Sequence, residues 1–143
     1  MPINELKSIH EFLLQLTPKL DLRKLNATEI DAYLGSREKA PFDSDWSWAY
    51  QEVEDRKNQL SKTTLQEIEN LNEKLRKTVF KNIIKITDSP DLAGYISDDF
   101  GLIFDAFSIS SLKKSWVFGL FDSYFHLKLP YGKASVLERP DIK

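Results

Sequence analysis

The stretch from residue 46 to residue 86 constrains the fold most, because its apolar residues recur with helical spacing, about every 3.6 residues. They are Trp46, Tyr50, Val53, Leu60, Leu65, Ile68, Leu71, Leu75, Val79, Ile83 and Ile86. The polar run SKTT inside this stretch leaves two readings open. Either one helix spans about 44–86, or two helices meet near Ser61. We favour two helices, because Thr64 followed by Glu67 has the spacing of a capping box.

Helical spacing also extends to the rest of the chain. Apolar residues at steps of three and four predict a helix over about 3–16. Asn26, three residues before Glu29, predicts the capped start of a second, shorter helix. Ser89 followed by Pro90 predicts the start of a helix over about 90–107, since Ser can cap a helix and Pro fits its first turn.

The last helix is expected over about 111–127. This segment is rich in aromatic residues and Val, so a β-hairpin is the alternative. Helical steps favour the helix, and they join Trp116, Leu120, Tyr124 and Leu127. Together the segments predict an all-α fold, an irregular bundle of five or six helices. We expect a single domain over 1–143 with an irregular tail from about 128, since 143 residues suit one domain.

Composition and charge limit the classes of function. The chain has no cysteine, which excludes disulfides and thiolate metal sites, and we expect no metal or cofactor. It shows no secretory signal pattern and no apolar run of roughly 20 residues, so a cytoplasmic protein without a membrane partner is expected. The net charge of −2 argues against a general nucleic-acid binder. A local contact with RNA or DNA is a third hypothesis, through Lys74, Lys77, Lys81 and Lys85.

An acidic stripe is predicted on the helix over 90–107. Aspartates and glycines recur there at steps of three and four, opposite the apolar residues: Asp91, Gly94, Asp98, Gly101 and Asp105. Asp99 falls nearer the edge of the apolar face. The stripe is either a solvated face, a close helix crossing that needs the glycines, or a strip on which a partner docks. A divalent-metal site is a further alternative, but it needs converging oxygens, and Asp98 and Asp99 diverge by about 100° on a helix. It is equally open whether the stripe is free or pairs with the four lysines of residues 74–85.

Trp48 lies out of phase with the apolar face of its predicted helix. It shares another face with Glu52 and Asp55, and an exposed Trp rimmed by acids is typical of an interface hot spot. The alternative is that a neighbouring helix or the loop over 36–43 covers it.

Enzyme signatures are missing from the sequence. His10 in HEFLLQ lacks the second His of a zinc-protease helix, and the chain has neither a Gly-rich phosphate loop nor a nucleophile elbow. We therefore expect no catalytic residues and no enzymatic activity.

One pattern runs through the closing part of the chain: Tyr95-Ile96-Ser97-Asp98-Asp99-Phe100-Gly101-Leu102-Ile103, then Trp116, Leu120 and Tyr124, then Leu129-Pro130-Tyr131-Gly132. In this pattern the chain resembles a group of small uncharacterised bacterial helical proteins that include toxin-immunity proteins. The resemblance implies a protein that binds a cognate toxin, such as a basic toxin domain, and occludes its active or substrate site. The residues expected to contact that partner are Asp91, Asp98, Asp99, Asp105, Trp48, Glu52 and Asp55. The alternative is a structural or adaptor domain that self-associates as a homodimer through the last helix.

Overall fold

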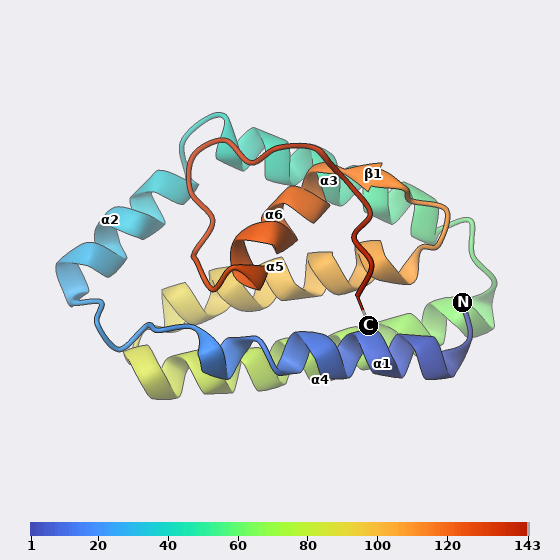
Figure 1. Cartoon of the computed structure of the whole chain (residues 1–143), viewed down its shortest axis with the longest axis horizontal. Coiled ribbons are helices and arrows are strands. Elements are labelled where there is room, and N and C mark those ends of the chain that lie inside the picture. The colour runs from blue at the N-terminus through green and yellow to red at the C-terminus, as the bar shows by residue number, and fades with distance from the viewer. Residues whose placement is uncertain (143) are drawn as a thin grey trace.

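Six α-helices carry most of the chain in the computed structural model, which describes residues 1–142 (Figure 1). They are α1 (Ile3–Leu14), α2 (Ala27–Arg37), α3 (Phe42–Lys57), α4 (Lys62–Thr87), α5 (Pro90–Ser108) and α6 (Trp116–Phe125). A 3-10 helix, η1 (Thr17–Lys19), follows α1, and two short strands, β1 (Lys114–Ser115) and β2 (Leu137–Glu138), pair antiparallel. The all-α prediction is confirmed. Within the described residues, no helix combines the length and apolar character that a membrane crossing requires.

Polar side chains set the helix starts. The Asn26 side chain accepts a hydrogen bond from the Glu29 backbone N–H at 2.8 Å, and the Glu29 carboxylate accepts from the Asn26 N–H. This capping box was predicted. The two-helix reading of residues 44–86 is also correct, but the cap of α4 is Ser61, whose hydroxyl accepts from the Thr64 N–H at 3.2 Å. Ser115 caps α6, which therefore begins later than the expected residue 111.

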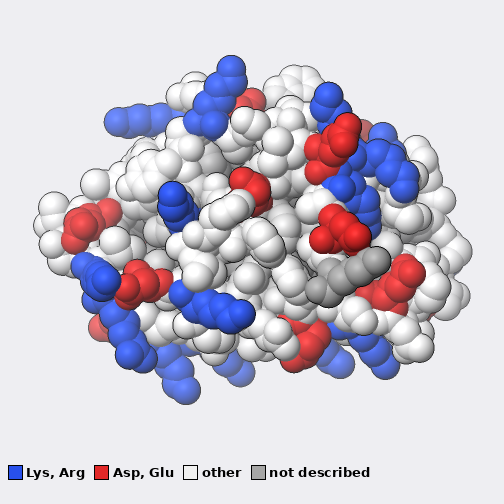
Figure 2. Space-filling model, in the orientation of Figure 1, with Lys and Arg blue, Asp and Glu red and all other residues white. Residues whose placement is uncertain are grey.

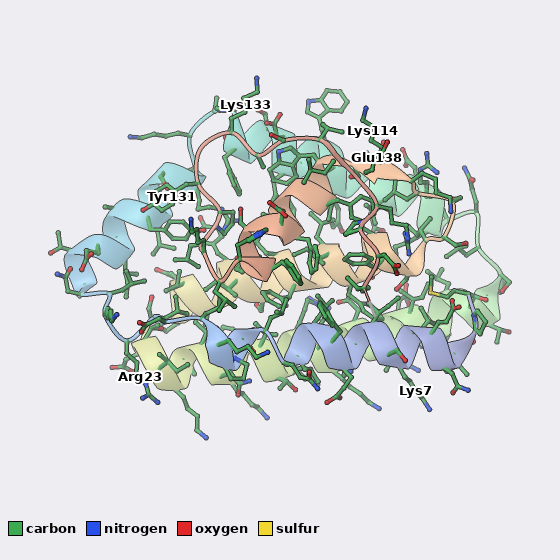
Figure 3. All side chains as sticks on the ribbon, viewed as in Figure 1. Lys7, Arg23, Lys114, Tyr131, Lys133 and Glu138 are labelled. Carbon is green, nitrogen blue, oxygen red and sulfur yellow. The ribbon has the colours of Figure 1, made fainter. Side chains whose placement is uncertain are left out.

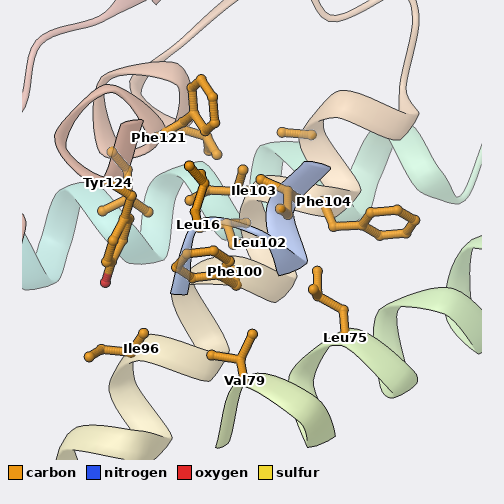
Figure 4. Close-up of a cluster of buried hydrophobic side chains, with 14 of the residues drawn as sticks. Leu16, Leu75, Val79, Ile96, Phe100, Leu102, Ile103, Phe104, Phe121 and Tyr124 are labelled. Carbon is orange, nitrogen blue, oxygen red and sulfur yellow. The ribbon is translucent and has the colours of Figure 1, made fainter. Parts of the chain in front are cut away.

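Helix α5 is the central element of the bundle. It packs along α4 and also contacts α1, α2, α3 and α6. Figure 4 shows aromatic and aliphatic side chains of α5 meeting those of α4 and α6, among them Phe100, Phe104, Leu75, Val79 and Tyr124. Burying each such side chain contributes about 1.5–3 kcal/mol to folding. The bundle is therefore assembled around one helix.

Helix α6 is nearly enclosed as well. Every residue from Trp116 to Phe121 is buried, as is Tyr124, while Phe125 is 49% exposed. The self-association alternative needed this helix as an interface, and its burial leaves little apolar surface for one.

The C-terminal tail lies across α6, as the red trace in Figure 1 shows. A Cβ atom on Gly119 would come within 1.9 Å of the Ser135 carbonyl oxygen, so the crossing requires glycine there. Arg139 donates to the carbonyl oxygens of Phe107, Ile109 at 3.1 Å and Leu112 at 3.2 Å, which closes the C-terminal end of α5. The tail is irregular apart from β2, and these contacts fix it to the bundle.

Candidate functional site

The predicted acidic stripe is exposed over only half of its length. Asp91 and Asp98 are exposed and Gly94 is half-buried, whereas Gly101 and Asp105 are buried. The expectation of one continuous exposed strip is therefore wrong for its C-terminal half. Both α3 and α4 place side chains against that half of α5.

Asp99 is a buried structural residue rather than a surface acid. Its carboxylate accepts two hydrogen bonds from Arg37 at 2.7 and 2.9 Å, one from the Trp46 indole N–H at 2.9 Å and one from the Tyr124 hydroxyl at 2.6 Å. These bonds connect α2, α3 and α6 to α5. Burial lowers the pKa of the Arg37 guanidinium, but the charge and hydrogen bonds of Asp99, together with Tyr33 and Tyr124, outweigh burial, and the pKa lies above its usual value. The expectation that Asp99 contacts a partner is not supported by its position, because its side chain is inaccessible.

Asp105 is paired in a similar way. Lys57 donates to it at 2.9 Å and the Asn72 amide donates to it at 2.8 Å, while Lys57 also donates to Glu54 at 3.2 Å. Burial raises the pKa of Asp105, and the bonds from Lys57 and Asn72 oppose that rise. Asp105 is therefore almost fully covered by its own partners, with 6% of its surface exposed, whereas an exposed acid was expected.

The lysines of α4 do not neutralise the acids of α5. All four are exposed, namely Lys74, Lys77, Lys81 and Lys85. Lys77 forms an ion pair with Glu73 of its own helix at 3.0 Å. Figure 2 shows Lys and Arg side chains protruding along the edge below α1 and α4. The hypothesis that this basic stripe pairs with the acidic stripe is wrong, because Lys57 of α3 supplies the cation of Asp105 and none of the four lysines forms an ion pair with Asp91 or Asp98 in the described part of the chain.

Gly101 marks a close crossing of α4 and α5. A Cβ atom there would lie 2.7 Å from Cδ of Arg76 and 3.3 Å from Oδ1 of Asn72. Asn72 donates to the Gly101 carbonyl oxygen at 2.9 Å and accepts from Nε of Arg76 at 2.6 Å. The close-crossing reading is thus correct for Gly101. It does not hold for Gly94, where nothing lies within 4 Å of an added Cβ atom.

A groove of about 640 Å³ opens between α3 and α4, with α5 as its floor. Figure 1 shows α3 and α4 on opposite sides of α5. The residues that line this α3–α4 groove are Trp46, Tyr50, Glu54, Lys57, Glu69, Asn72, Glu73, Arg76, Asp98, Gly101, Leu102 and Asp105. Five of them are acids and two are bases, so the groove has an acidic balance.

Aromatic rings form one wall of the groove. The Trp46 and Tyr50 rings stack with centroids 5.6 Å apart and planes inclined by 10°. The hydrogen bond to Asp99 fixes the Trp46 ring, and Tyr50 is 45% exposed. An exposed ring on a fixed support suits a contact surface.

Asp98 lies at the edge of the groove. Its carboxylate forms no hydrogen bond or ion pair with any of residues 1–142. Partial burial raises the pKa of its carboxyl group, and the charge of Asp99 raises it further. Asp98 and Trp46 also line a smaller hollow of about 280 Å³ with Glu38, Asp43 and Tyr95. These two residues therefore connect two concave surfaces.

Trp48 lies on a different face of α3. It is 77% exposed, so the alternative that a helix or loop covers it is wrong. With Glu52 it borders a hollow of about 730 Å³ that also includes Lys114 and Lys133, both labelled in Figure 3. Asp55 is exposed and accepts a hydrogen bond from Gln51 at 2.9 Å. The predicted contact residues are thus divided between two surfaces.

Trp46 and Tyr50 were missed as site residues because their spacing assigned them to the core. A signal was present, since Trp46, Tyr50, Glu54 and Lys57 follow one another at helical steps. A face that mixes aromatic and charged residues in this way is rarely all core. Among residues 1–142 no cluster of three or more His, Asp or Glu side chains is arranged to hold a metal ion.

Comparison with known proteins gives one finding. The sequence model of the family described as immunity protein PIM1 matches residues 13–131, which include α2 to α6 and every residue of the α3–α4 groove. No curated protein and no solved structure matches the chain. The resemblance to toxin-immunity proteins noted in residues 95–132 is confirmed.

Proposed function

The chain belongs to the family of immunity protein PIM1, and from this membership we propose that it neutralises a cognate bacterial toxin by binding it and covering its active or substrate site. The family match is the observation that carries the proposal. The partner is then a protein, and the chain acts by occupying a surface, without catalysis.

The α3–α4 groove is the proposed centre of the contact. Its acids outnumber its bases, and the acidic surface continues past Asp98 to Asp91, Glu38 and Asp43 through two adjoining hollows. A toxin domain with a basic substrate groove would be complementary to this surface. Such complementarity raises the association rate and sets specificity more than it raises affinity.

Trp48, Glu52 and Asp55 are proposed as a second, separable contact. They project from α3 on a side that does not line the groove. A toxin centred on the groove would therefore contact them only at the edge of its interface. Asp99 and Asp105 support the surface from within, by holding Trp46 and Lys57 in place.

The test is a titration of the product of the adjacent gene, taken as the candidate toxin. The purified chain is added to the toxin, the activity of the toxin is followed, and complex formation is measured by calorimetry. Occlusion predicts that inhibition is complete at one equivalent and that it coincides with complex formation. A variant with Lys7→Glu, at an exposed position of α1 that lines neither the groove nor its adjoining hollows, serves as a control that should bind as well as the unmodified chain. Inhibition by substoichiometric amounts, or protection without a complex, would contradict occlusion.

A further inference from the structure

We propose that the α3–α4 groove binds an arginine side chain of the toxin, with the guanidinium against the Tyr50 ring and bonded to the Asp98 carboxylate. This inference rests on the proposed function and specifies the chemistry of the contact.

Asp98 is an exposed acid of α5 that lines the α3–α4 groove. Its neighbours Asp99 and Asp105 each have a cation at 2.7 and 2.9 Å, respectively. Asp98 forms no ion pair within residues 1–142. Its carboxyl group is partly withdrawn from water, and its pKa stays above its usual value although the charges of Arg76 and Arg37 lower it. Desolvating a carboxylate without a partner is unfavourable. A cation from outside would relieve that cost, and this position is therefore prepared for one.

The aromatic pair specifies the kind of cation. Tyr50 is 45% exposed and lies parallel to Trp46, whose indole is fixed by Asp99. A guanidinium can stack on such a ring and, in the same pose, donate two parallel hydrogen bonds to a carboxylate. A lysine ammonium can form the ion pair but not the planar, two-bond arrangement.

The chain itself contains this arrangement one residue away. Arg37 donates two hydrogen bonds to Asp99, and its guanidinium carbon lies 4.4 Å from the Phe42 ring centroid and 5.1 Å from that of Tyr95. The proposed arginine would make the same combination with Asp98 and Tyr50, on the open side of α5. The internal pair shows that α3 and α5 can position an acid and aromatic rings around one guanidinium.

The two bases of the groove do not occupy this position. Lys57 bonds to Asp105 and Glu54, and Nε of Arg76 bonds to Asn72. Glu69, also in the groove, adds negative charge. The charges of Arg76 and Arg37 act on Asp98, but neither side chain is hydrogen-bonded to its carboxylate, which therefore keeps its acceptor positions for an incoming cation.

The experiment compares two matched variants of the full chain, Asp98→Asn and Asp91→Asn, in binding to the toxin. Both remove one exposed charge from the same helix, so a generic electrostatic effect would weaken both equally. We expect Asp98→Asn to weaken binding by about 10- to 100-fold, because it removes one partner of a charged hydrogen-bonded pair. Asp91→Asn is expected to weaken it by less than about threefold.

Tyr50→Ala should weaken binding by roughly tenfold. Thermal unfolding of each variant shows that it is folded.

A double-mutant cycle then identifies the partner residue. Each arginine at the surface of the toxin is replaced by Ala and by Lys, and one of them should lose its effect in the Asp98→Asn background. The Lys substitution of that residue should also weaken binding. Equal effects of Asp98→Asn and Asp91→Asn, no coupled arginine, or full binding by the Lys variant would overturn the inference. A change of self-association by light scattering in Asp98→Asn would overturn it too, by assigning the groove to a second copy. If the unmodified chain does not bind the toxin at all, the proposed function fails instead.

Discussion

Asp98 and Asp99 are adjacent in sequence but have opposite surroundings. Asp99 is fully buried and accepts four hydrogen bonds from three other helices, whereas Asp98 is exposed and receives none from residues 1–142. Successive residues of a helix diverge by about 100°, which points one carboxylate inward and the other outward. One acid therefore organises the bundle, and the other is available for a partner.

Asp99→Asn should destabilise the protein strongly. The amide keeps the shape of the side chain but leaves the buried Arg37 guanidinium without its counter-charge, and breaking a buried ion pair costs roughly 3–5 kcal/mol. Urea unfolding should show a midpoint at lower urea concentration, while the slope of the free energy of unfolding against urea concentration stays unchanged. Asp98→Asn is the matched control, and its free energy of unfolding should stay within about 0.5 kcal/mol of the original. Similar stabilities for the two variants would contradict this division of roles.

The local features of the fold were predictable from sequence, and the pairing of distant residues was not. The Asn26 cap and the start of α5 at Pro90 depend on residues within one helical turn, so their spacing reveals them. The Arg37–Asp99 and Lys57–Asp105 pairs join positions 62 and 48 residues apart. Periodicity shows which side of a helix is polar, but it cannot show which other helix will cover that side. The stripe was therefore placed correctly at Asp91 and Asp98, and wrongly at Asp105.

Lys57→Met should expose the dependence of Asp105 on its cation. The substitution keeps an apolar chain of similar length but leaves a buried carboxylate, and we expect a loss of roughly 3 kcal/mol in the free energy of unfolding. Adding Asp105→Asn should recover at least about 1 kcal/mol, because the amide needs no counter-charge and its oxygen can still accept from Asn72. Lys62→Met, at the exposed start of α4, is the control and should change little. A double variant as unstable as Lys57→Met would show that the ion pair is not the source of the loss.

The His10 side chain should make stability depend on pH. Burial lowers the pKa of His10 below 6.5, Glu11 opposes this effect and Lys74 adds to it. Nε2 is buried without a hydrogen-bond partner among the described residues. The His10 and Phe104 rings are nearly perpendicular, with their centroids 6.1 Å apart. The unfolded state therefore binds a proton to His10 more readily than the folded state does. The contribution of neutral His10 to the free energy of unfolding is complete above pH 6.5, and it is lost as the pH falls through the lower pKa of the folded state.

Urea unfolding at pH 7.5 and at pH values down to 5 measures this effect. The His10→Leu variant should lose less stability over that range than the original chain, while Ser8→Ala, an exposed non-titrating change on the same helix, should retain the original pH dependence. Parallel curves for the original chain and His10→Leu would exclude His10 as the titrating group.

The glycines of α5 and α6 should respond in opposite directions to alanine. Gly94 lies inside α5 with nothing within 4 Å of an added Cβ atom, so Gly94→Ala should stabilise the protein by about 0.5–1 kcal/mol through helix propensity alone. In Gly119→Ala the new methyl group would collide with the Ser135 carbonyl oxygen at 1.9 Å. The tail would have to move from α6, and overpacking of this kind costs about 1–3 kcal/mol. The midpoint temperature of thermal unfolding should therefore rise by a few degrees for Gly94→Ala and fall for Gly119→Ala.

A lower midpoint for Gly94→Ala would mean that this position has a packing role that its open surroundings do not reveal. Unchanged stability in Gly119→Ala would mean that the tail is held only loosely against α6.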